Sequence, residues 1–205
     1  MLIENKNGSI WRKWDLHIHS TASDGNGTPE QIIAAAKEKG LAVIALTDHH
    51  TVNNIDEAKR IGQENGITVI SGIEFKTEYG KRSVHMIGLF PDEFDGQTLG
   101  EEVLYDQILC KLGLSKTEVI DYAKIHRKGN KLVDQEKLFH EGLLLKHVDF
   151  KTAANLIHKY GGLVSVHAGT KEASIEEIYN DNKNGTKIID SLETLKEELM
   201  SGYID

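Results

Sequence analysis

The chain has 205 residues, of which 39% are hydrophobic and 27% are charged, and its formal net charge is −8. This length suits one domain that buries a substantial core. The acidic balance argues against a broad electrostatic contact with nucleic acid, although it does not exclude a nuclease, because bound divalent cations would reverse the local potential. No apolar run approaches the ~20 residues that span a bilayer.

The cysteine content and the first residues bear on the compartment. The chain has one cysteine, Cys110, which excludes an internal disulfide and fits a reducing environment. The opening residues lack the long apolar core of a signal peptide. We therefore expect a cytoplasmic protein that has no membrane partner.

The N-terminal part alternates predicted strands and helices. A first strand at about 13–19 leads through a polar loop to a helix that Thr28 caps and Gly40 ends. The apolar run 41–47 is typical of a strand buried on both faces of a parallel sheet. The same pattern then predicts a helix at about 54–65 and strands at 67–71 and 83–89.

Residues 92–148 break this alternation. They predict short polar helices at about 104–114 and 116–126, and we interpret them as a helical insertion. The alternation resumes with a helix from 149 to 160, a strand at 163–166, a helix from about 174, a strand at 187–189 and a final helix. We expect one domain over residues 1–205, with a parallel sheet and right-handed crossovers.

Two histidines stand close together near the end of the first strand. His17 and His19 occupy alternate positions, so their imidazoles project to the same face. Two ordinary histidines at a strand edge are the alternative to a metal site. Potential ligands also stand at or near the following strands: Asp24, His49, Glu74, His85 and His167. A turn residue is the alternative for Asp24, and a core histidine is the alternative for His85.

The ordered motifs DLHIHS, SDG, TDHH, GIEF, SVHMIG and SVHAG resemble the polymerase and histidinol phosphatase family, the PHP domain. The resemblance covers residues 13–90 and resumes at 160–169. It implies a distorted (β/α)7 barrel of α/β class, here without its last strand or strands. It also implies a cluster of two or three metal ions that hydrolyses phosphoesters. Small nucleotide phosphatases and 5′-to-3′ exonucleases form the subgroup that the chain looks most like.

The resemblance divides the predicted ligands among three metals: His17, His19 and Glu74 for the first; Glu74, His85 and His167 for the second; Asp24 and His49 for the third. Imidazole mixed with carboxylate suits manganese, zinc or iron. The family pattern usually closes with an Asp-x-His pair, but no histidine follows His167 here. Truncation before the last strand or an incomplete third site would each explain this departure.

The predicted reaction is attack by a metal-activated hydroxide on a phosphoester. Glu74, Asp48 and His50 are the predicted catalytic residues, and Asp48 is expected to orient a ligating histidine. His50 stands where the family commonly has a second aspartate. It is either a general acid or extra ligand, or a residue with a supporting or surface role.

The substrate and partners are open at this stage. A phosphorylated small molecule, a nucleotide or a nucleic-acid end would each suit the predicted centre. Residues 8–14 are similar to the lead-in of PHP domains fused to ATPase domains, so a fused or partnered ATPase is a further expectation. Two alternatives remain: a degenerate metal-binding module that regulates a larger ATPase or polymerase, and an amidohydrolase-type metal barrel.

Overall fold

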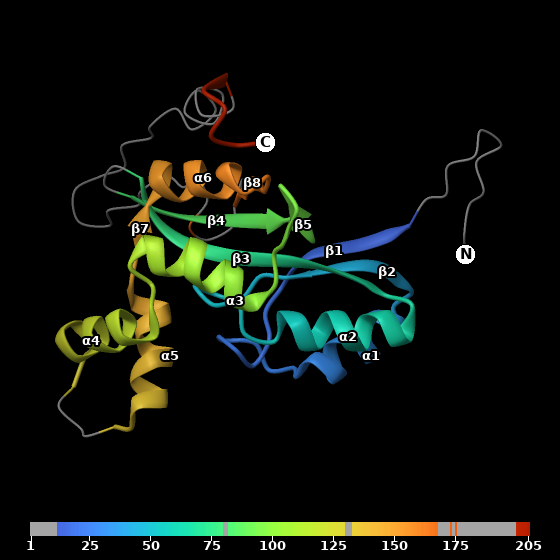
Figure 1. Ribbon diagram of the computed structural model, residues 1–205. Helices are drawn as coiled ribbons and strands as arrows, with labels where there is room; N and C mark the ends of the chain where they lie inside the picture. Colours follow the sequence, from blue (N-terminus) through green and yellow to red (C-terminus); the bar gives the residue numbers. More distant parts are fainter. Residues whose placement is uncertain (1–11, 80–81, 130–132, 168–172, 174, 176–199) are drawn as a thin grey trace, which may run out of the picture.

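The computed structural model describes residues 12–79, 82–129, 133–167, 173, 175 and 200–205. A curled sheet crosses the molecule, and helices pack along it (Figure 1). The strands of this sheet are β1 (Lys13–Ile18), β2 (Leu41–Leu46), β3 (Thr68–Tyr79), β4 (Arg82–Phe90), β7 (Val148–Asp149) and β8 (Leu163–Val166). Their order is β1-β2-β3-β4-β8, and β7 pairs with β3. The structure confirms an α/β fold, and the strands within the described residues form a half-barrel sheet that does not close.

The helices are α1 (Pro29–Glu38), α2 (Ile55–Asn65), α3 (Glu101–Leu104), α4 (Lys116–His126), α5 (Gln135–Leu145) and α6 (Phe150–Lys159). Four of them, α1, α2, α4 and α6, begin and end close to the predicted residues. The sequence does not predict α5, and α3 ends where the helix predicted at about 104–114 begins. The Thr28 side chain accepts a hydrogen bond from the backbone N–H of Gln31, whose side chain returns to the Thr28 N–H. This reciprocal capping fixes the start of α1, as the sequence predicts.

The expected all-parallel sheet is wrong for β4. The β1–β2 and β2–β3 pairs are parallel, but β4 runs antiparallel to both β3 and β8. The physical reason is the short connection between β3 and β4, because parallel neighbours need a crossover of a dozen or more residues. Strand β3 also continues to Tyr79, so Glu74 lies within the strand and not at its end.

Helices α2 and α6 cover one face of the sheet, and Glu74 points to the other. A Cβ atom on Gly62 of α2 would stand 2.7 Å from Val69, and one on Gly88 would meet Ile157 of α6 at 2.9 Å and Phe75 at 3.4 Å. Val69 and Phe75 both occupy odd positions of β3, so they share a face. The even position of Glu74 directs its carboxylate to the opposite, concave face.

The segment expected to be an insertion contains a two-stranded hairpin and several helices. The hairpin joins β5 (Glu93–Phe94) and β6 (Gln97–Thr98), and a π-helical turn (Tyr105–Leu109) and a 3-10 turn (Cys110–Leu112) follow α3. Helices α4 and α5 lie against each other at one end of the molecule (Figure 1). The described residues contain no helix that is long and apolar enough to cross a membrane. The helix expected from 174, the strand at 187–189 and the final helix lie outside the described residues.

Candidate metal centre

Five imidazoles form a closed ring on the concave face of the sheet. Neighbouring ring centroids lie 4.7–5.3 Å apart. The order around the ring is His17, His19, His49, His85 and His167, and the last histidine returns to the first. The structure therefore brings together histidines that the sequence separates by up to 150 positions.

The Glu74 carboxylate lies at the centre of this ring and is 1% exposed. Its Oε2 atom faces three imidazole nitrogens: His17 Nε2 at 3.0 Å, His19 Nε2 at 2.6 Å and His49 Nδ1 at 3.6 Å. Its Oε1 atom faces two others: His85 Nδ1 at 2.8 Å and His167 Nε2 at 3.0 Å. One buried carboxylate thus contacts all five imidazoles.

Asp24 forms a second anionic point at the edge of the ring. Its Oδ1 atom lies 2.6 Å from His19 Nδ1, and its Oδ2 atom lies 3.6 Å from His49 Nε2. Both histidines therefore stand between the Asp24 and Glu74 carboxylates. The Asp24 side chain is 45% exposed, so this side of the centre is open to solvent.

Backbone pairing holds these side chains in place. The Glu74 N–H donates to the carbonyl of Asp48 at 3.1 Å, and the His50 N–H donates to the carbonyl of Glu74 at 3.0 Å. The His167 N–H donates to the carbonyl of His85 at 3.1 Å. The histidines after β2 and β8 are thus bound to β3 and β4 through the main chain.

The pKa values of His19 and His49 are shifted in opposite directions. Burial alone would lower the pKa of His19, but its hydrogen bonds to Glu74 and Asp24 raise that pKa to about 9. Burial lowers the pKa of His49 to about 4. Burial also opposes ionisation of Glu74, yet hydrogen bonds from the surrounding imidazoles hold the pKa of that carboxyl well below its usual range. The centre therefore contains a buried carboxylate anion, and the imidazoles around it differ in how readily they bind a proton.

The donor set fits divalent cations. Within the part of the chain that the structure describes, two groups have ligand atoms within 4.8 Å of one another: His17, Glu74 and His167, and His19, His49 and Glu74. His17 Nε2 and His19 Nε2 lie 3.1 Å apart while both face Glu74. Facing imidazole nitrogens can share only one proton, so a cation satisfies both of them better. Nitrogen and carboxylate donors suit zinc, manganese or iron.

Asp48 binds the loop that carries Asp24. Its carboxylate is buried and accepts hydrogen bonds from the Ser20 N–H at 2.8 Å, the Ser20 hydroxyl at 2.7 Å and the Ser23 hydroxyl at 2.6 Å. Sequence reasoning missed both serines, although they stand inside the DLHIHS and SDG motifs. These contacts favour a role for Asp48 in positioning Asp24, because both serines belong to the loop that carries Asp24.

His50 faces away from the ring and joins its loop to the C-terminal end of α5. The residue is 1% exposed, which excludes the expected surface role, and it adopts a positive φ of 50°. Its Nε2 atom lies 3.1 Å from the Lys146 carbonyl and 3.2 Å from the Lys76 N–H. Burial lowers the pKa of His50 to about 3, so the ring is neutral. These contacts support a structural role, and a catalytic role stays a prediction.

Comparison with known proteins identifies related sequences. The model of the PHP domain family matches residues 15–202. The 5′-3′ exoribonuclease of Haemophilus influenzae is 45% identical over 78 residues, which are 38% of this chain and 28% of that protein. The 3′,5′-nucleoside bisphosphate phosphatase of Chromobacterium violaceum is 39% identical over 75 residues, which are 37% of this chain and 26% of that protein. The chain thus matches less than a third of the length of each of these two relatives.

A solved structure shows the same fold. It is that of a protein from Bifidobacterium adolescentis assigned as a metal-dependent phosphoesterase, and its TM-score is 0.58 at 17% identity. The alignment covers 95% of this chain and 76% of that chain. At this identity the likeness concerns the fold, and it agrees with the half-barrel sheet described above.

Proposed function

Because the chain belongs to the PHP domain family, we propose that it is a metal-dependent phosphoester hydrolase of the nucleotide phosphatase or 5′-to-3′ exonuclease type. The observation that carries this proposal is the contact of five imidazoles with the buried Glu74 carboxylate. The two relatives support it, since an exoribonuclease and a nucleoside bisphosphate phosphatase both cleave phosphoesters.

The proposed centre holds two or three manganese, zinc or iron ions. Its proposed ligands are His17, His19, Asp24, His49, Glu74, His85 and His167. When bound, such ions lower the pKa of a coordinated water and neutralise phosphate oxygens during in-line attack. The two oxygens of Glu74 face different imidazoles, so this carboxylate would help to hold ions together with both sets of histidines.

The chain itself supplies orientation and access. Glu74 fixes the surrounding imidazoles, and Asp24 fixes the Nδ1 atom of His19 from the other side. The solvent-exposed Asp24 marks the side from which a phosphate group can approach, because Glu74 is covered. Asp48 keeps Asp24 in place through Ser20 and Ser23.

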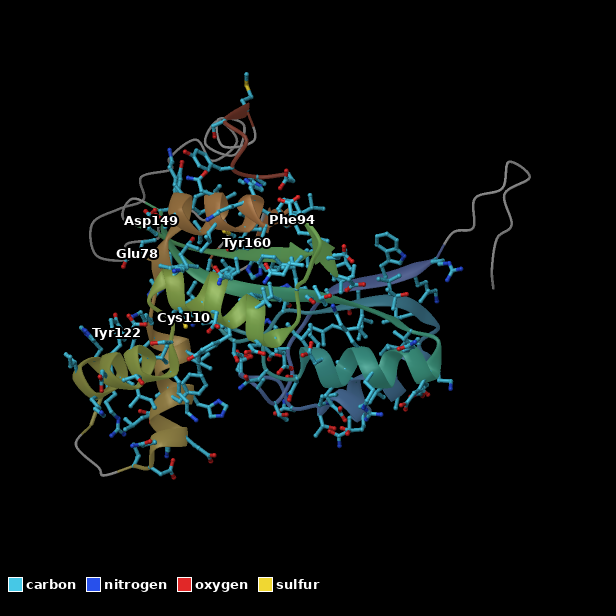
Figure 2. The ribbon with its side chains drawn as sticks, viewed as in Figure 1. Glu78, Phe94, Cys110, Tyr122, Asp149 and Tyr160 are labelled. Atoms are coloured by element: carbon cyan, nitrogen blue, oxygen red, sulfur yellow. The ribbon has the colours of Figure 1, made fainter. Side chains whose placement is uncertain are left out.

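The decisive experiment compares two isosteric variants on one strand. Glu74→Gln removes the central charge. Glu78→Gln changes an exposed carboxylate that stands four residues further along β3, on the same face of the strand (Figure 2). We expect Glu74→Gln to lose both bound metal, measured by elemental analysis, and hydrolysis of nucleotides and short oligonucleotides. Glu78→Gln should keep both properties.

Two outcomes would contradict the proposal. Normal metal content with full activity in Glu74→Gln would exclude the centre from the reaction. A wild-type protein that binds metal but hydrolyses no phosphoester would favour the regulatory module instead. The ATPase partner stays a prediction, because residues 1–11, which include part of the motif behind it, lie outside the described residues.

A further inference from the structure

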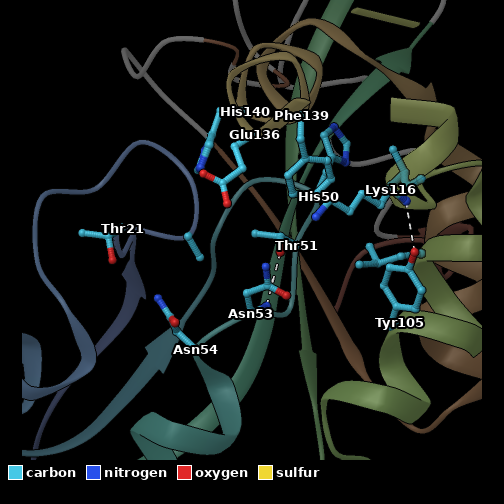
Figure 3. Close-up of a pocket in the computed structure, with 13 residues that line it drawn as sticks. Thr21, His50, Thr51, Asn53, Asn54, Tyr105, Lys116, Glu136, Phe139 and His140 are labelled. Atoms are coloured by element: carbon cyan, nitrogen blue, oxygen red, sulfur yellow. Dashed lines mark hydrogen bonds between the residues drawn. The ribbon is translucent and has the colours of Figure 1, made fainter. Parts of the chain in front are cut away.

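A cavity of about 480 Å³ lies between the loops of the metal centre and the helical insertion. Figure 3 shows Thr21, Asn53 and Asn54 on one side of it and Phe139 and Lys116 on the other. The first three residues follow β1 and β2, whereas the other two belong to α5 and α4. The size is that of pockets that bind small organic ligands.

The wall of this cavity is connected to the candidate metal centre by hydrogen bonds. The Ser20 hydroxyl accepts from the Asn54 side-chain amide at 3.0 Å and from the Ala22 N–H at 3.1 Å, and it donates to Asp48 at 2.7 Å. Asn54 and Ala22 line the cavity, and the same loop continues to Asp24. A ligand in the cavity would therefore lie beside the loop that carries a proposed metal ligand.

The opposite wall offers an aromatic ring. Phe139 is half-buried, and Leu109 and Leu114 are each 1% exposed, so they belong to the wall but present little surface to a ligand. The Lys116 ammonium lies 5.8 Å from the centroid of the Phe139 ring. An aromatic ring stacks on a nucleobase, because every base has a π-face, and a nearby cation adds a cation–π attraction.

The charges of the cavity select against a longer nucleic acid. Surfaces that follow a single strand combine aromatic residues with a positively charged groove. Among the described residues of this wall, the positive charge of Lys116 is balanced by the negative charge of Glu136. A small polyol phosphate is also disfavoured, since it would leave the ring of Phe139 against polar groups.

We propose that this cavity binds the nucleoside part of a phosphoester substrate, with the base against Phe139. The proposal rests on the proposed hydrolase function and makes it more specific. The amides of Asn53 and Asn54 and the hydroxyl of Thr21 supply hydrogen-bonding groups for the polar edges of the base and sugar. The insertion thus determines which leaving group is accepted, whereas the sheet carries the metal ligands.

The test measures nucleoside binding without hydrolysis. The full chain, free of metal, is titrated with adenosine and with uridine by equilibrium dialysis. Phe139→Leu removes the ring but keeps an apolar side chain, and we expect it to weaken binding about tenfold. Tyr122→Leu is the matched control: Tyr122 is a half-buried aromatic residue on α4, within the same helical segment but outside the cavity (Figure 2). This control should bind nucleosides like the wild type.

A second variant keeps the test conclusive if Phe139→Leu fails to fold. Asn53→Ala changes an exposed residue of the opposite wall and should weaken nucleoside binding severalfold. Folded wild-type protein that binds neither nucleoside would overturn the proposal, and so would full binding by both variants. Hydrolysis of glycerol 3-phosphate and of nucleotides is measured separately. Nucleoside binding without any metal-dependent hydrolysis would overturn the hydrolase function alone.

Discussion

The His85 Nδ1 atom lies 2.8 Å from Glu74 Oε1, although His85 stands near the beginning of β4 and Glu74 in the middle of β3. The antiparallel register explains this contact, because it pairs Lys76 with His85 and Glu74 with Ile87. A parallel β4 would place its last residues at this edge of the sheet. The reversal of one strand therefore allows a histidine near the start of a strand to join ligands that follow other strands.

Asp48→Asn should loosen the loop that carries Asp24. The buried Asp48 carboxylate accepts three hydrogen bonds, and an amide in its place would direct N–H groups toward at least one donor. Hydrogen bonds to charged groups contribute about 1.5–3 kcal/mol each. We therefore expect the free energy of unfolding to fall by about 2 kcal/mol in a urea titration. Elemental analysis should also show less bound metal than in the wild type.

Asp121→Asn is the control for this prediction, because Asp121 is exposed on α4 and pairs with Lys124. It should change neither the unfolding free energy nor the metal content measurably. If Asp48→Asn keeps the full metal content despite its lower stability, Asp48 supports the fold without positioning Asp24.

The stability of the metal-free protein should decrease as the pH rises from 6.5 to 9. The folded pKa of His19, about 9, lies above its ordinary value of 6.5, so the protonated ring stabilises the fold fully below pH 6.5. That contribution is lost as the pH rises through 9. His49 and His50 have lowered pKa values of about 4 and 3, so they act in the opposite sense below pH 6.5. Thermal melts with a chelator should show the decrease.

The affinity for metal should increase with pH over the range in which the stability of the metal-free protein decreases. A ligating imidazole must be neutral, so uptake of the ion displaces the proton from His19. Titration calorimetry with Mn²⁺ at pH 7.5, in buffers of different ionisation enthalpy, should therefore record proton release. Affinity should rise toward pH 9. Affinity that is independent of pH over this window would exclude His19 as a ligand.

Asp56 and Glu101 should show a coupling that exceeds simple additivity. The Asp56 N–H donates to Glu101 Oε1 at 3.0 Å, and the Glu101 N–H donates to Asp56 Oδ1 at 3.3 Å, so each carboxylate caps the helix of the other. Each alanine substitution removes one cap, which contributes about 1 kcal/mol, and also removes the repulsion between the two carboxylates. Both single variants gain the relief of this repulsion, whereas the double variant gains it only once. The double variant should therefore lose more stability than the sum of the single variants. A double-mutant cycle in urea measures this coupling. Equality within about 0.3 kcal/mol would exclude the repulsion.

The sequence predicted the ligand-bearing strands better than it predicted the contacts between them. Helix α1 followed from Thr28 and Gly40, since caps and stops are local signals. The antiparallel direction of β4 and the binding of Asp48 to Ser20 depend on tertiary pairing, which a strand pattern does not encode. His50 shows the same limit, because its partner Lys146 lies 96 positions away.

Gly142→Ala should separate α4 from α5 and alter the cavity. Alanine normally stabilises a helix interior by up to ~1 kcal/mol relative to glycine. Here, however, a Cβ atom would stand 2.4 Å from the backbone carbonyl oxygen of Val119, which cannot rotate away. We expect a net destabilisation of about 1–3 kcal/mol in urea unfolding, as for overpacked cores. Since Phe139 lies on α5, nucleoside binding should weaken as well. Lys137→Ala, at an exposed position of the same helix, should change neither quantity. If Gly142→Ala instead stabilises the protein, α4 and α5 do not pack as closely as this contact requires.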